Sequence, residues 1–297
     1  MKRFTVLFLI AGIVQAQNSG NAGLSFLKIG LSPKIIATGD LGVAGSNDIS
    51  GVNYNPAILT KINSSQILFS HNSWIQDVQS EFLTASFNLF NLPFAVSINS
   101  TSVDDIEIRT RRGEADSKIS AYYFYTGIGT GINLMEDLSA GISVKYLYEG
   151  IYSDEADGWG FDFGLLYTTA IENLEVGASL RNIGSMSKLR AEKTVLPAEL
   201  RLGAAYKLHS EEINSDLNLS GGFLKLLDVD GLHLHLGAEL DYSRIISFRF
   251  GYVSGYDSKS ITTGLGVNWN KVAFDYSYIP FANDLGSSNT IALTYTF

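Results

Sequence analysis

The chain has 297 residues, of which 17% are charged and 12% aromatic, and it contains 29 glycines and no cysteine. The absence of cysteine excludes disulfides, thiolate nucleophiles, cysteine-ligated metals and a lipid-modified N-terminal cysteine. The net charge of −9 argues against nucleic acid as a partner. The length permits one large β domain or two ordinary domains.

The first 16 residues have the pattern of a cleaved secretory signal peptide. Lys2 and Arg3 are followed by an apolar run over 4–14 and by a small residue, Ala16. The run is too short for a transmembrane helix, which needs about 20 apolar residues. The alternative is a buried N-terminal strand. Cleavage after Ala16 would remove two cations and take the net charge from −9 to −11.

Residues 17–63 form an irregular stretch rich in Gly, Ser and Asn. Asn55 before Pro56 is a good helix start, with Asn as the cap and Pro in the first helical position. We therefore expect one or two short helices in this stretch and no strands. A floppy leader is the alternative, but the apolar side chains require burial; they are Phe26, Leu27, Ile29, Ile35, Ile36, Ile58 and Leu59.

After residue 64 the pattern changes to nearly continuous alternation of apolar and polar residues, interrupted by turns. The predicted strands are 65–71, 82–90, 93–100, 119–134, 138–149, 159–169, 174–183, 198–208, 216–226, 231–242, 245–253, 259–269, 271–279 and 289–297. Most approach the 9–11 residues that a tilted strand needs to cross a bilayer. Short links alternate with longer ones, such as 72–81, 101–118 and 150–158. This alternation is typical of outer-membrane barrels.

One face of each predicted strand is apolar and the other carries glycine and charge. In 245–253, for example, Phe248 and Phe250 oppose Arg249 and Gly251. A water-soluble closed barrel of this size would have a lumen too wide for its apolar side chains to fill. In a bilayer the same faces point outward into lipid. A soluble β-sandwich is the alternative, and it would partition into the aqueous fraction without detergent.

The C-terminal strand places Ile291, Leu293, Tyr295 and Phe297 on one face. A terminal aromatic residue suits the aromatic girdle of a barrel at the lipid–water boundary. We expect this strand to close the barrel against 65–71. We also interpret Tyr295 and Phe297 as an assembly signal for the outer membrane.

Several motifs resemble the PorV/PorQ family of Bacteroidetes-type outer-membrane proteins, which are relatives of the FadL barrels. The motifs are Ala22-Gly23 with Phe26-Leu-Lys-Ile-Gly30, Gly39 to Asp48, Asn55-Pro-Ala57, Phe69-Ser-His-Asn-Ser-Trp-Ile-Gln-Asp-Val78, Phe161-Asp-Phe-Gly164 and Leu180-Arg-Asn-Ile-Gly184. The resemblance implies an all-β, transmembrane antiparallel β-barrel of about 14 strands over 64–297. It also implies that 17–63 folds into the lumen as a plug carrying Asn55, Pro56 and Ala57.

Two functions follow from the resemblance. Some PorV/PorQ proteins serve the type IX secretion system, so the first hypothesis is a non-enzymatic barrel that supports protein secretion or surface export. The second is a FadL-like channel for small hydrophobic molecules. The channel requires an apolar pocket between plug and wall that is continuous with a lateral opening, and a lumen packed only with charged pairs would count against it.

The expected partners are outer-membrane lipid and lipopolysaccharide, the barrel-assembly machinery, and secreted cargo proteins or secretion subunits. We expect the bacterial outer membrane as the location, and no cofactor. The sequence offers no phosphate loop, no nucleotide fingerprint and no Ser-His-Asp arrangement that its pattern supports.

Other candidate sites have a plainer interpretation. His233 and His235 share a strand face and would hold a metal or, more simply, join a lumenal hydrogen-bond network. Asp154, Glu155 and Asp157 would form a calcium-binding or merely solvated loop. Arg109, Arg111 and Arg112 would contact lipopolysaccharide or remain solvated. The inward-facing charges of both signs are expected to pair across the lumen wall or to hold the plug; they are Lys145, Asp162, Glu175, Arg181, Glu199, Arg201, Lys207, Glu239, Arg249 and Asp275.

Overall fold

The computed structural model describes residues 23–111 and 113–297. The predicted signal peptide at 1–16 and the first residues of the 17–63 stretch lie outside the described residues, as does Arg112. Within the described residues, no helix is long and apolar enough to cross a membrane.

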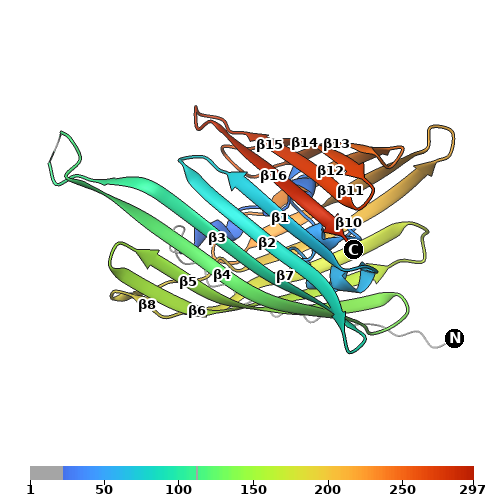
Figure 1. Cartoon of the computed structure of the whole chain (residues 1–297), viewed down its shortest axis with the longest axis horizontal. Helices are drawn as coiled ribbons and strands as arrows, with labels where there is room; N and C mark the ends of the chain where they lie inside the picture. The colour runs from blue at the N-terminus through green and yellow to red at the C-terminus, as the bar shows by residue number, and fades with distance from the viewer. Residues whose placement is uncertain (1–22, 112) are drawn as a thin grey trace.

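Fourteen antiparallel strands close into one barrel (Figure 1). They are β1 (Gln66–Ser73), β2 (Val78–Leu89), β3 (Leu92–Ile108), β4 (Ser117–Asn133), β5 (Leu138–Ile151), β6 (Asp154–Thr168), β7 (Leu174–Met186), β10 (Glu199–Ser210), β11 (Ser215–Leu226), β12 (His233–Tyr242), β13 (Ile246–Val253), β14 (Ile261–Trp269), β15 (Val272–Pro280) and β16 (Ser287–Thr296). Two short strands, β8 (Lys188–Leu189) and β9 (Glu192–Lys193), form a separate hairpin between β7 and β10. The predicted fold class and strand number are confirmed.

The apolar faces point outward, as predicted. Phe248 and Phe250 of β13 are each 52% exposed on the outside, whereas Arg249 between them is 6% exposed. The register places β1 against β16, with Ile67 opposite Tyr295 and Phe69 opposite Leu293. The predicted closure of the barrel by its C-terminal strand is therefore confirmed.

The connections form two rims, which we call the short-turn rim and the long-loop rim. The short-turn rim carries the links 90–91, 134–137, 169–173, 211–214, 243–245 and 270–271. The long-loop rim carries 74–77, 109–116, 152–153, 187–198, 227–232, 254–260 and 281–286. The difference in length between the connections of the two rims is smaller than expected, since 152–153 on the long-loop rim is a tight turn.

Two expected loops are largely strand. Most of 101–118 belongs to β3 and β4, whose hairpin extends past its neighbours (Figure 1). Asp154, Glu155 and Asp157 belong to β6 and do not form a loop. The expectation failed because consecutive polar residues, Asp104-Asp105 and Asp154-Glu155, interrupt the alternation that marks a strand. In β3 this interruption coincides with a shift in the register with β4 between Val103 and Ile106.

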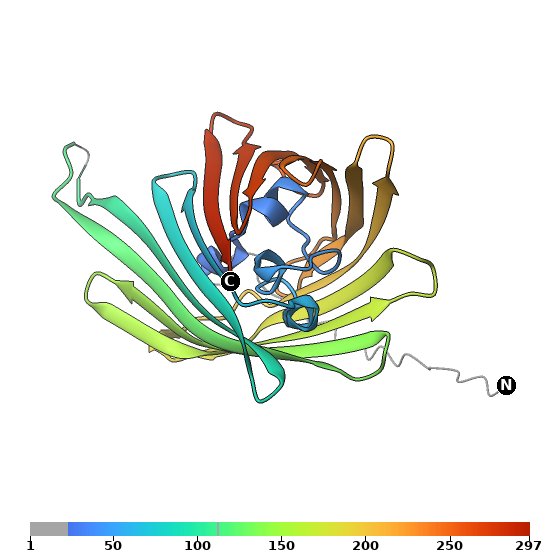
Figure 2. The same ribbon diagram turned by 45° about the vertical axis from the view of Figure 1, so that its right-hand side comes forward.

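The N-terminal segment, defined as residues 23–63, lies inside the ring of strands (Figure 2). It contains η1 (Ser25–Lys28), α1 (Pro33–Ala37), η2 (Ile49–Gly51) and η3 (Pro56–Lys61). Its start adjoins Thr194 of the long-loop rim, and its end leads into β1 at the short-turn rim. The segment therefore runs through the lumen from one rim to the other.

The predicted helix start at Asn55 is confirmed. The Asn55 side chain accepts a hydrogen bond from the Ala57 amide at 3.0 Å, and Pro56 occupies the first position of η3. The Asn55 side-chain amide also donates to the carbonyls of Val43, at 2.7 Å, and Leu165, at 2.9 Å. One fully buried side chain thus caps η3 and attaches it to β6.

Candidate binding site inside the barrel

A buried ionic network attaches the N-terminal segment to the wall. Arg201 of β10 donates to the carbonyl oxygens of Asp40, at 2.6 Å, and Leu41, at 3.0 Å. Its Nε also lies 3.0 Å from Glu199 Oε1, and Arg181 Nη1 lies 2.5 Å from the same oxygen. Because one carboxylate balances two guanidinium groups, the backbone carbonyls supply further negative partial charge. The inward charges therefore both pair and hold the segment, as expected.

Tyr54 lies within this network. The guanidinium carbons of Arg201 and Arg181 lie 5.1 and 5.6 Å from its ring centroid. Its hydroxyl donates to Asp40 Oδ1 at 2.8 Å and accepts from the Leu31 amide at 3.2 Å. Burial and the Asp40 carboxyl raise the pKa of Tyr54 well above its ordinary value. The hydroxyl therefore stays protonated and keeps its role as a donor.

Further ion pairs line the inner wall at other heights. They are Lys145–Asp162 at 2.6 Å, Arg249–Asp275 at 2.6 Å, Arg249–Glu239, Lys61–Glu175 at 2.7 Å and Lys207–Asp216 at 2.8 Å. The wall is consequently charged but locally neutralised. This leaves the ends of the lumen as the places where a ligand could enter.

An apolar pocket of about 430 Å³ opens at the long-loop rim, between the N-terminal segment and the wall. We call it the rim pocket. Its apolar lining comes from the N-terminal segment and from five other parts of the chain: Leu24, Phe26, Ile29, Trp74, Ile75, Val78, Val103, Tyr123, Leu226 and Tyr256. Phe26 stacks on Tyr123 with ring centroids 5.4 Å apart, which fixes one side of the pocket. Ligand sites of this kind are typically about 300–1,000 Å³ and mostly apolar.

A few polar groups edge the rim pocket. Lys28, Glu149 and Lys259 contribute to its lining. The Lys259 ammonium lies 4.5 Å from the ring centroid of Tyr256, and burial lowers the pKa of Lys259. Glu149 accepts a hydrogen bond from Thr194 at 3.1 Å. The pocket is thus an apolar space with isolated polar groups, an arrangement that orients a small ligand.

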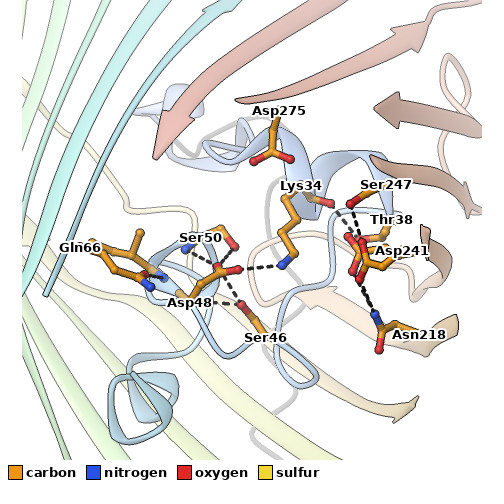
Figure 3. A network of polar contacts seen from close by, with 12 residues as sticks. Lys34, Thr38, Ser46, Asp48, Ser50, Gln66, Asn218, Asp241, Ser247 and Asp275 are labelled. Carbon is orange, nitrogen blue, oxygen red and sulfur yellow. Dashed lines mark hydrogen bonds and ion pairs between the residues drawn. The ribbon is translucent and has the colours of Figure 1, made fainter. Parts of the chain in front are cut away.

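Two polar cavities occupy the short-turn side of the N-terminal segment, with volumes of about 260 and 380 Å³. Lys34 and Asp241 line both of them. Figure 3 shows Lys34 of α1 pointing toward Asp48, with an Nζ–Oδ2 distance of 2.7 Å. Asp48 also accepts from the Ser50 amide at 3.0 Å. The charged and polar side chains in both linings suit water and ions.

The predicted site residues lie far apart. Asn55, Pro56 and Ala57 are buried where η3 meets β5 and β6, and they do not line the rim pocket. Tyr295 and Phe297 lie on the outer wall at the short-turn rim, with their rings edge to face at a centroid distance of 4.9 Å. Neither group contacts the other, so the two predictions concern separate properties.

The two inward histidines lie together at the long-loop rim, but only the ring of His235 is hydrogen-bonded, because His233 Nδ1 is buried without a partner among the described residues. His235 contacts the Gly39 carbonyl oxygen through Nδ1, and His233 stacks on Tyr256 with ring centroids 4.0 Å apart. The described residues contain no cluster of three or more His, Cys, Asp or Glu side chains arranged to hold a metal. Arg109 is paired with Glu107 and donates to the Gly113 carbonyl at 2.8 Å, which partly neutralises the basic cluster.

Sequence reasoning missed the rim pocket. Its lining comes from segments as far apart as residues 24 and 259, and no periodicity connects them. The only hint in the sequence was the apolar start of the N-terminal segment, whose side chains needed burial. It did not indicate which residues of the barrel wall would face them.

No protein-family model and no curated protein sequence matches the chain. Among solved structures it is similar to the Pseudomonas putida toluene transporter TodX, with a TM-score of 0.62 and 12% identity over 90% of this chain and 98% of that one. It is also similar to the CymD monoaromatic hydrocarbon channel, with a TM-score of 0.64 and 14% identity over the same shares. A Pseudomonas aeruginosa FadL homologue gives a TM-score of 0.52 and 10% identity over 86% of this chain and 95% of that one.

At such identities the likeness concerns the fold. The chain shares the closed 14-stranded architecture of these FadL-type channel structures over nearly its whole described length. The comparisons therefore show the fold that the FadL barrels share. No comparison carries the narrower assignment to the PorV/PorQ family.

Proposed function

We propose that the chain is an outer-membrane channel that binds small hydrophobic molecules at the long-loop rim and passes them inward. The observation that carries this proposal is the rim pocket, which supplies the apolar pocket between the N-terminal segment and the wall that the channel hypothesis required. A lateral opening, the second feature that the hypothesis required, remains part of the proposal. A lumen filled only with charged pairs would have counted against transport, and the long-loop end of this lumen is apolar.

The outer wall supports a location in a bilayer. Its exposed apolar residues form a continuous belt, with aromatic side chains toward both rims: Tyr122, Trp159 and Tyr252 toward the long-loop rim, and Tyr167, Tyr206, Tyr242, Trp269, Tyr295 and Phe297 toward the short-turn rim. Transmembrane barrels carry such girdles at the two lipid–water boundaries. The fold shared with outer-membrane channels supports the same location.

The secretion hypothesis has weaker support. It rests on the resemblance of short motifs to the PorV/PorQ family, and no feature of the described residues favours cargo recognition over channel activity. The structural neighbours include channels for toluene and monoaromatic hydrocarbons by their own descriptions. These comparisons favour the channel as the function to test first.

The test fills the rim pocket without disturbing the wall. Val103 of β3 lines the pocket, whereas Val96 of the same strand is exposed on the outer wall. The purified barrel in detergent is titrated with toluene in competition with a fluorescent hydrophobic probe. We expect Val103→Trp to weaken toluene binding at least about tenfold, because a buried side chain of that size occupies the ligand's volume. Val96→Trp serves as the matched control and should bind like the wild type.

Equal binding by both variants would exclude the rim pocket as the site. Radiolabelled toluene uptake into cells that express each variant then tests passage. If Val103→Trp abolishes binding but leaves uptake unchanged, the pocket is a side site and the channel proposal fails.

A further inference from the structure

Three side chains on the outer wall form a continuous hydrogen-bonded chain. His71 and Ser73 share the outward face of β1, and Glu81 lies opposite His71 on β2. His71 Nδ1 lies 3.1 Å from Glu81 Oε1, and His71 Nε2 lies 3.2 Å from Ser73 Oγ. This is the nucleophile–base–carboxylate order of a serine hydrolase, in which each group lies within hydrogen-bonding reach of the next.

We propose that Ser73, His71 and Glu81 form a hydrolytic site on the lipid-facing wall, which cleaves the acyl esters of membrane lipids. Ser73 is the nucleophile and His71 the general base. Glu81 is a positioning residue, since it acts on the substrate only through the imidazole.

The hydrogen-bond pattern sets the required tautomer. The Glu81 carboxylate can only accept, so Nδ1 of His71 carries a proton and donates to it. In the neutral ring Nε2 is then unprotonated and can accept the Ser73 hydroxyl proton. Ser73 Oγ also lies 3.0 Å from Gln79 Oε1, so that proton has a second acceptor in the resting state.

The height of the site on the barrel indicates the substrate. The outward residues one step closer to the membrane centre are Phe69 and Leu83, which belong to the apolar belt. His71 is level with Ile291, and Ile291 is level with Tyr276. Ser73 and its neighbours therefore lie where apolar wall gives way to polar side chains. In a bilayer, lipid ester groups occupy the same boundary between hydrocarbon and headgroups.

The site is accessible from the membrane. The side chains of His71 and Glu81 are 37% and 46% exposed. The adjacent β1–β2 connection is short, spanning only 74–77. A lipid diffusing along the wall could thus present its ester to Ser73 without leaving the bilayer.

The reaction consumes one water for each ester. Ser73 Oγ attacks the carbonyl carbon while His71 Nε2 takes the hydroxyl proton, and the resulting tetrahedral intermediate expels the alcohol, which receives that proton. Water then attacks the acyl-serine with His71 again as base, releasing a fatty acid and restoring the Ser73 hydroxyl.

The experiment uses the full barrel in mixed micelles of detergent and a phosphatidylethanolamine with two oleoyl chains. A fluorophosphonate probe should label the wild type at a single serine, identified as Ser73 by mass spectrometry, and fatty acid should be released. Ser73→Ala should lose the label and reduce release by a factor on the order of 10²–10⁴. Ser100→Ala is the matched control, because Ser100 is an exposed serine of β3 directly opposite Glu81.

Glu81→Gln separates positioning from a structural role. It should lower kcat about tenfold or more and leave KM unchanged, because the lipid does not touch this side chain. Heat-modifiable mobility in gels verifies that each variant is a folded barrel. An unlabelled wild type, or release by folded Ser73→Ala equal to that of the wild type, would overturn the proposal.

Discussion

Gly164 lies where the inner wall packs directly against the N-terminal segment. A Cβ at this position would lie 2.0 Å from Asn55 Oδ1 and 2.9 Å from Pro56 Cδ. At Gly160, on the same face of β6, the nearest atom would be a flexible methyl group of Leu147 at 3.3 Å. We expect Gly164→Ala to destabilise the barrel by about 1–3 kcal/mol through overpacking, and Gly160→Ala to have a smaller effect. Urea unfolding followed by tryptophan fluorescence measures both variants, and equal losses would contradict this close fit.

Asp48 should make the N-terminal segment sensitive to acid. Burial opposes ionisation, but the Lys34 ammonium outweighs it and lowers the pKa of Asp48 from 3.8 to about 2. A lowered carboxyl pKa stabilises the fold above the unfolded value, and this stabilisation is lost as the pH falls through the folded value. The shift corresponds to roughly 2 kcal/mol, present above about pH 4 and lost toward pH 2.

Asp48→Asn tests this dependence. In unfolding titrations from pH 2 to pH 6, the wild type should exceed the variant by about 2 kcal/mol near pH 6, and the difference should narrow below pH 4. If the difference in unfolding free energy stays constant across this pH range, the ionised form of Asp48 does not stabilise the fold through its ion pair with Lys34.

Local residue chemistry could be predicted from the sequence, whereas long-range partners could not. The cap of η3 was predictable because Asn55 and Pro56 are adjacent in the chain. The second role of Asn55, as donor to Leu165, was not predictable because 110 residues separate the two. In the same way, glycines on the inward face were evident, but the segment lying against them was not.

Among the elements, β16 carries the clearest sequence signal. Its apolar stripe predicted the outward face, because alternate side chains of a strand share a face. The pairing with β1 followed from its place as the last strand, since a closed barrel joins its last strand to its first. The extent of β3 and β4 was underestimated, since their polar ends project beyond the belt that imposes alternation. The alternation of apolar and polar residues therefore predicts the parts of a strand that face lipid, but it does not reveal the parts that project beyond the membrane.

Replacing Tyr295 and Phe297 by Ser should impair assembly into the outer membrane. Terminal aromatics on the strand that closes the barrel resemble an insertion signal, and both side chains are exposed on the outer wall. We expect a several-fold loss of heat-modifiable barrel in outer-membrane fractions. Trp269→Ser is the control, because Trp269 is an exposed aromatic of the same rim that is not at the terminus. An undiminished amount of barrel in the double variant would show that the terminal aromatics carry no such signal.

At the scale of the whole molecule, the N-terminal segment divides the lumen of the barrel into two parts. The rim pocket faces the long-loop rim, the two polar cavities face the short-turn rim, and the N-terminal segment lies between them. The composition and the alternation of apolar and polar residues predicted the closed barrel. They could not predict this division of the lumen, because it depends on which wall residues the N-terminal segment covers along its course.

That course can be tested with cysteines, since the chain has none of its own. A Cβ on Gly23 would lie 3.5 Å from Thr194 Cβ, which is within the range that a disulfide spans. We expect the variant with Gly23→Cys and Thr194→Cys to cross-link on mild oxidation, as judged by gel mobility and by mass spectrometry of the linked peptides. The pair Gly23→Cys and Ser65→Cys should remain reduced, because Ser65 precedes β1 at the opposite rim. Cross-linking of the second pair in place of the first would show that the segment begins as well as ends at the short-turn rim, and the rim pocket would then lose the residues that form one of its sides.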